Sequence, residues 1–241
     1  MIEKPLAGTA GPDTVTAPAE PSRQRILAPP RGAAIAGVIF SVLMILGLGL
    51  SRLAVPTDLT HPGTWLTQPY RRDAVGLALN LVPFAGIAFL WFMGVLRDRL
   101  GELEDKFFAT VFLGSGLLFV ACLFASAALS GALIAAVAAG NIRSPDSESY
   151  YLGRRAIDAL LNLYAMKMAA VFIFSTCTIG LRSAIFPRWV AFTGWACALV
   201  LLVVIANWKW IALLFPLWML LLSMQMLVAE FRLRHAKSAG G

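Results

Sequence analysis

The sequence has few charged residues. Asp, Glu, Lys and Arg make up 14% of its 241 residues, whereas hydrophobic residues make up 59%, and the mean hydropathy is +0.76. Soluble domains carry roughly 25% charged residues. The deficit excludes an ordinary water-soluble fold and predicts a protein whose solvent is a lipid bilayer.

Residues that commonly bind metals or cross-link small folds are scarce as well. The two histidines, His61 and His235, lie in a predicted loop and in the C-terminal tail, so they form no metal cluster with each other. The odd number of cysteines, each inside an apolar run and at no metal-ligand spacing, argues against a disulfide framework: Cys122, Cys177 and Cys197. The chain also lacks the common hydrolase, metalloprotease and phosphate-loop motifs. The sequence therefore predicts no metal, no cofactor and no catalytic residue.

The formal net charge is +7, but the lysines and arginines lie in loops and tails beside apolar runs. No basic stripe alternates with aromatic residues, so nucleic acid is excluded as a partner. Cytoplasmic loops of membrane proteins carry an excess of Lys and Arg. With the N-terminus inside, inner segments hold twelve of these residues and outer segments seven. This bias predicts a multi-pass protein of the inner (plasma) membrane with both termini in the cytoplasm.

Apolar runs of about 20 residues predict six membrane-spanning helices, and hence an all-α bundle over residues 32–230. Residues 1–31, rich in proline and without apolar periodicity, are predicted to be a disordered cytoplasmic tail, and residues 231–241 a basic cytoplasmic tail. The predicted spans are 33–54, 74–96, 107–139, 156–181, 189–206 and 210–229.

Three spans have features that predict how they pack. The run 107–139 would be about 50 Å long as a helix, so it must tilt, protrude or break, and its many small residues predict a central place in the bundle. Gly37 and Ser41 form a small pair in the first span that permits close helix approach. Asn80, Pro83 and Gly86 predict an irregular helix in the second.

Lys167 is a lone cation in the run 156–181. It lies roughly 16 Å from the outer end of this span, near the bilayer centre, where a lysine costs about 2.5 to 3.5 kcal/mol. Tyr164 shares its helix stripe. No acid lies deep in any predicted span, so its partners must be neutral groups such as Asn80 or carbonyls near Pro83. Either Lys167 marks a polar cavity for an anion or a proton, or it is held structurally by carbonyls and water.

A second polar group lies at the outer end of the same span. Asp158 and Asn162 are four residues apart on one helix face, close to Arg154 and Arg155. They form either a polar vestibule or a salt-bridged helix end at the headgroup level. The candidate ligand-binding residues are therefore Lys167, Tyr164, Asn80, Asn162 and Asp158.

Two short segments, Arg31-Gly32-Ala33-Ala34-Ile35-Ala36-Gly37 and Phe186-Pro187-Arg188-Trp189, together with the span layout, resemble an uncharacterised family of actinobacterial multi-pass integral membrane proteins. The resemblance implies a polytopic helical bundle. It implies no activity and no site residue.

Two functions remain open. The first is a protein that binds or transports a small anionic molecule or lipid around Lys167, for which Lys167→Leu should abolish binding without unfolding. The second is a structural or accessory subunit packed against a partner membrane protein, for which small-residue faces of spans 33–54 or 107–139 should matter instead. An enzyme is a distant third, because no acid, nucleophile and base fall together.

Overall fold

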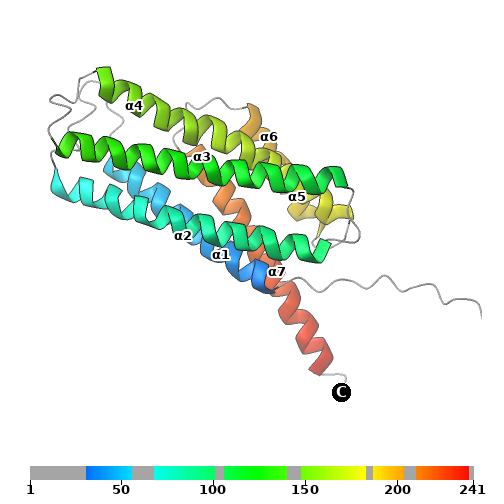
Figure 1. Ribbon diagram of the computed structural model, residues 1–241. Helices are drawn as coiled ribbons and strands as arrows, with labels where there is room; N and C mark the ends of the chain where they lie inside the picture. Colours follow the sequence, from blue (N-terminus) through cyan, green and yellow to red (C-terminus); the bar gives the residue numbers. More distant parts are fainter. Residues whose placement is uncertain are drawn as a thin grey trace, which may run out of the picture.

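The computed structural model describes residues 31–55, 68–100, 106–139, 148–182, 187–203 and 210–238, and within these ranges it is helical with no strand (Figure 1). The predicted tail 1–31, apart from Arg31, lies outside the described residues, as do residues 204–206 of the predicted span 189–206. The helical elements are α1 (Arg31–Ala54), α2 (Pro69–Leu100), α3 (Lys106–Ala138), α4 (Glu148–Asp158), η2 (Ala159–Ala165), α5 (Met166–Arg182), α6 (Arg188–Val203), η3 (Ile211–Leu213) and α7 (Leu214–Ser238).

The predicted multi-pass helical fold is confirmed in its coarse form. In the described part of the chain, five helical segments are long and apolar enough to cross a membrane, and α6 is a shorter apolar helix of 16 residues. The elements α4, η2 and α5 form one continuous helix of 35 residues. The helix α7 continues to Ser238, so it extends into the residues predicted to be a tail.

The helix α3 packs against α2, α4, η2 and α5, as a central position requires, but it is less buried than the prediction implies. The helix is unbroken, but 22% of its most apolar window is buried, the lowest share of the five spans, against 50% for α1. It packs through large side chains such as Phe112 and Phe119, while Ala121, Ala125 and Ala128 are exposed on its outer face. Small residues suit close helix contact, but in a bilayer they are equally compatible with a surface that faces lipid.

The irregular helix is also found elsewhere than predicted. The helix α2 is α-helical throughout, with Pro83 inside it and exposed. The irregular segment among the described residues is η2, a π-helix of seven residues between α4 and α5. A π-helix is wider than an α-helix, because its hydrogen bonds join residues five apart.

Phenylalanines form the centre of the core, one from each of five helices. Their side chains are fully buried, and the ring centroids of contacting pairs lie 4.9 to 6.2 Å apart. Aromatic rings prefer such tilted and edge-to-face arrangements. The five are Phe40 of α1, Phe89 of α2, Phe119 of α3, Phe172 of α5 and Phe215 of α7.

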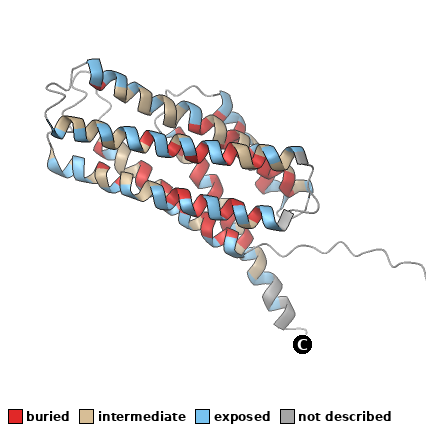
Figure 2. Cartoon of the chain, viewed as in Figure 1, coloured by how far each residue is buried: buried red, intermediate tan, exposed pale blue. Residues whose placement is uncertain are grey.

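Packing is uneven along the bundle. We call the end that holds Ala54 and Glu148 the Ala54 end and the opposite one the Arg31 end. Buried residues gather towards the Arg31 end, at the right of Figure 2, whereas residues towards the Ala54 end are mostly intermediate or exposed. At the Arg31 end α1 is tied to α7 by an ion pair between Arg31 and Glu230. The looser half of the bundle is where a binding site has room.

Candidate binding cavity

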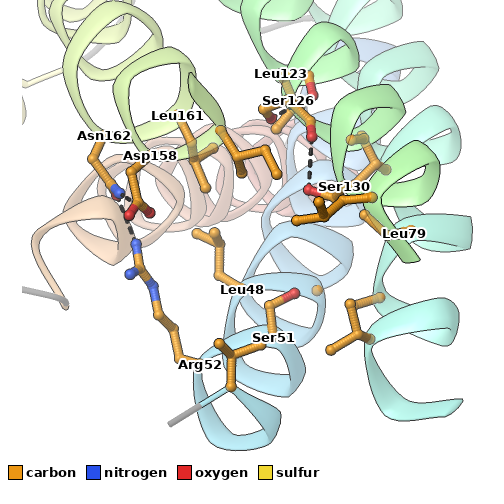
Figure 3. A pocket seen from close by; sticks show the side chains of 18 of the residues that line it. Leu48, Ser51, Arg52, Leu79, Leu123, Ser126, Ser130, Asp158, Leu161 and Asn162 are labelled. Carbon is orange, nitrogen blue, oxygen red and sulfur yellow. Dashed lines mark hydrogen bonds between the residues drawn. The ribbon is translucent and has the colours of Figure 1, made fainter. Parts of the chain in front are cut away.

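A cavity of about 630 Å³ lies in the half of the bundle nearer the Ala54 end. Residues of α1, α2, α3, α4 and η2 line it (Figure 3). Most are apolar, among them Leu48, Leu79, Leu123 and Leu161. Small-molecule sites are typically concave, largely apolar and about 300 to 1,000 Å³ in volume, so the cavity has the size of a ligand site.

Helix packing closes three sides of the cavity. The helix α1 packs along α2, α2 against α3, and α3 against both α4 and η2. Between α1 and η2 the described residues make no comparable packing. There the guanidinium of Arg52 spans the gap, and its Nη2 donates a hydrogen bond to Oδ1 of Asn162 at 2.6 Å (Figure 3). One side chain thus joins the two helices on the fourth side.

The polar residues of the cavity gather beside this bond. Asn162 Nδ2 lies 3.5 Å from Oδ1 of Asp158, to which it donates. Arg154 and Arg155 also line the cavity, so three arginines accompany one carboxylate. A guanidinium stays protonated in proteins and matches the planar geometry of carboxylate and phosphate. The polar side of the cavity is therefore net positive and suited to an anion.

The interior of the cavity offers hydroxyl groups rather than charges. Ser126 and Ser130 donate to backbone carbonyls of their own helix, at 2.8 Å to Leu123 and 2.7 Å to Ser126 respectively. Their oxygens keep lone pairs that can accept from water or from a ligand. Ser51 lines the same space from α1. The remaining lining atoms mostly belong to aliphatic side chains.

The π-helix places Asn162 in the cavity. Asp158, Ala159, Leu161, Asn162 and Leu163 all line it, although a regular α-helix would turn some of these neighbours away from one face. A π-helical turn holds more residues, so a longer run of the chain can face the same space. π-Helical segments inside α-helices are frequent at functional sites.

The predicted site residues divide into two groups. Asp158 and Asn162 lie together on the cavity, as a vestibule would require. Lys167 does not line it: its Nζ donates to the carbonyl of Leu201 at 3.0 Å and to that of Leu202, in the last turn of α6. Tyr164 and Asn80 are exposed and also lie outside the lining. Lys167, Tyr164 and Asn80 are therefore not brought together with Asp158 and Asn162.

Arg52 is the site residue that the sequence did not single out. In the sequence it is a cation at the end of a span, which is usual for a side chain reaching the membrane interface. The signal that distinguishes it is the absence of an acid on its own helix. Its actual partner, Asn162, is 110 residues away in the chain and could not be identified from spacing.

Within the described ranges, no group of three or more His, Cys, Asp or Glu side chains could hold a metal ion. The cysteines are free: Cys122, Cys177 and Cys197. The resemblance of residues 31–37 and 186–189 to the actinobacterial membrane family stays a prediction. No family model matches the chain, and no curated protein or solved structure matches it either.

Proposed function

We propose that this protein binds an amphipathic anion, either a lipid or a small molecule with an acidic head and an apolar tail, in the cavity beside Arg52. The observation that carries the proposal is the guanidinium of Arg52 at the edge of a mostly apolar cavity inside the membrane-spanning bundle. Arg52 lies near the end of its span, and its guanidinium lines the cavity and bonds to η2, where it can meet an anionic group.

The lining matches such a ligand at both ends. Arg52, Arg154 and Arg155 offer fork-shaped donors to the oxygens of a carboxylate or phosphate. Leu48, Leu79 and Leu123 offer aliphatic surface to a tail. A fully polar anion would leave this surface unused, and a neutral lipid would leave the arginines unused.

The bias of Lys and Arg supports an orientation with six spans, both termini in the cytoplasm and the Ala54 end at the outer face of the plasma membrane. The described part of α6 is an apolar helix of 16 residues that packs against both α5 and α7 as a member of the bundle. In this orientation the cavity faces the outer leaflet.

Binding of oleate to the protein in an uncharged detergent tests the proposal. We expect Arg52→Gln to weaken oleate binding about 10- to 100-fold, because a hydrogen bond to a charged group contributes about 1.5 to 3 kcal/mol. Oleyl alcohol, which has the tail without the charge, should bind weakly to both proteins. Isothermal titration calorimetry measures each affinity.

The matched control is Arg72→Gln, which removes an exposed arginine of α2 that does not line the cavity. It should leave oleate affinity unchanged. Equal affinity of the wild type and Arg52→Gln for oleate would refute the proposal.

One observation favours an accessory subunit as the second candidate. The small residues of α3, including Ala121 and Ala125, lie on the outer surface, where a partner helix could approach closely. Ala125→Phe should then release a protein that co-purifies from the native membrane. Unchanged co-purification, or no stoichiometric protein at all, would count against this candidate.

A further inference from the structure

We infer that the ligand is a membrane lipid with an anionic headgroup that enters the cavity sideways between α1 and η2, and that Asn162 holds Arg52 across this opening until the headgroup replaces it. The inference rests on the proposed function, since it needs a cavity that binds amphipathic anions. It adds the source of the ligand, its path and the group that it displaces.

The contacts of α1 differ between its two halves. Towards the Arg31 end, α7 packs along α1, with Phe40 and Phe215 in contact at a centroid distance of 5.6 Å. Towards the Ala54 end, the described residues between α1 and η2 are joined by the hydrogen bond of Arg52 to Asn162 and by no extended helix packing. Leu53 and Leu163, beside these two residues, are exposed and present aliphatic surface to the bilayer. As far as the described residues go, a lipid tail can therefore pass from the bilayer into the cavity by displacing the side chain of Arg52.

The bond across the opening has a neutral acceptor. Hydrogen bonds between two charged groups are shorter and stronger than those to a neutral amide. The phosphate or carboxylate oxygen of a lipid can therefore displace the amide oxygen of Asn162 from Arg52. A carboxylate at position 162 would resist that exchange.

Asp158 fixes which atom of Asn162 meets the arginine. Its Oδ1 accepts from Nδ2 of Asn162, which turns Oδ1 of the amide towards Arg52. Because an amide has one donor end and one acceptor end, the two contacts select one orientation. Asp158 thus bonds to the amide of Asn162, and its negative charge also acts on Arg52 through space.

Substitutions at position 162 test whether Asn162 holds Arg52 across the opening. The protein is reconstituted in vesicles of phosphatidylcholine with phosphatidylglycerol, extracted in uncharged detergent and analysed by native mass spectrometry for bound lipid. We expect Asn162→Asp to lower phosphatidylglycerol occupancy about tenfold, because the new carboxylate keeps Arg52. Asn162→Ala should raise occupancy, because it frees Arg52. If Asn162→Asp does not yield a monodisperse protein, Asn162→Glu replaces it, with the same expected sign.

The outcomes separate this inference from the function on which it rests. If Asn162→Asp and Asn162→Ala lower lipid occupancy equally while Arg52→Gln abolishes it, the role of Asn162 in holding Arg52 is overturned. The proposed binding function then stands. If glycerol phosphate in water binds to the Arg52 site as well as phosphatidylglycerol does, sideways entry is overturned. If Arg52→Gln retains both oleate and phosphatidylglycerol, the proposed function fails as well.

Discussion

At the scale of single residues, Lys167 joins two helices. Its ammonium group donates to the carbonyls of Leu201 and Leu202, in the last described turn of α6. Hydrogen bonds from a charged donor are stronger than those between neutral groups. Lys167 therefore fastens this turn of α6 to the start of α5.

From this contact, Lys167→Leu is expected to lower the free energy of unfolding by about 1.5 kcal/mol or more, because it leaves these carbonyls without their charged donor. Oleate affinity should stay unchanged, since the lysine does not line the cavity. Thermal unfolding in detergent and calorimetry on the same sample measure both quantities. Loss of oleate binding at an unchanged melting temperature would instead support a lysine-centred site.

At the scale of helices, α1 and α7 approach each other closely at Gly37. A Cβ atom there would collide with Oγ of Ser223 and lie 3.1 Å from Cδ2 of Phe92. The close approach predicted for the Gly37–Ser41 pair is thus found at Gly37, while Ser41 donates to the carbonyl of Gly37 at 2.7 Å. Ser223 is fully buried, and its hydroxyl has no hydrogen-bond partner among the described residues.

Two substitutions to leucine, one at a buried and one at an exposed position, should differ sharply. Gly37→Leu is expected to separate α1 from α7 and prevent a monodisperse fold, because the side chains of Ser223 and Phe92 leave no room. Ala125→Leu should be tolerated, because Ala125 is exposed on α3. Size-exclusion chromatography after extraction distinguishes them. Similar profiles for the two variants would show that the helix contact is wrong.

The collision at Gly37 can also be relieved. Gly37→Ala should destabilise the protein, and adding Ser223→Ala should restore part of the loss, because the partnerless hydroxyl is the nearest obstacle. The melting temperatures of the four proteins in this double-mutant cycle give the coupling. Strict additivity of the two changes would contradict the contact.

At the scale of the whole molecule, the phenylalanine cluster holds five helices together. Phe89 contacts Phe40, Phe119, Phe172 and Phe215, with centroid distances of 4.9 to 5.8 Å. Between membrane helices, such packing contributes through van der Waals contact rather than through transfer from water. None of the five rings lines the cavity, which begins one helical turn away, at Met44, Ala85 and Leu123.

We expect Phe89→Ala to destabilise the fold by about 3 kcal/mol, at the low end of the range for a buried phenylalanine, because lipid is as apolar as the core. Oleate affinity of the remaining folded protein should be unchanged. Chemical unfolding in mixed micelles checks the first part and calorimetry the second. A loss below 0.5 kcal/mol, roughly that of a surface change, would show that the rings do not hold the helices together.

The sequence predicted the helical bundle because long apolar runs have few other stable forms in a bilayer. It could not place α3, because an alanine such as Ala125 is equally apolar whether it faces lipid or a neighbouring helix. It identified Asp158 and Asn162 as a polar pair, because both lie on one helix near its end. The partners of Lys167 and Arg52 depend on which helices become neighbours. The spacing of residues within one helix does not predict that.

The π-helix at Ala159–Ala165 has a consequence for insertions and deletions. Elsewhere in a span, deleting one residue rotates the part of the helix before the deletion by about 100° relative to the part after it. Side chains that faced the core then face lipid. Within Ala159–Ala165 a deletion can be absorbed by a return to α-helical hydrogen bonding, so the bundle survives. The cavity would not, because Asp158 and Asn162 would turn relative to Arg52. A homologue one residue shorter in this segment should therefore share the fold and lack the site.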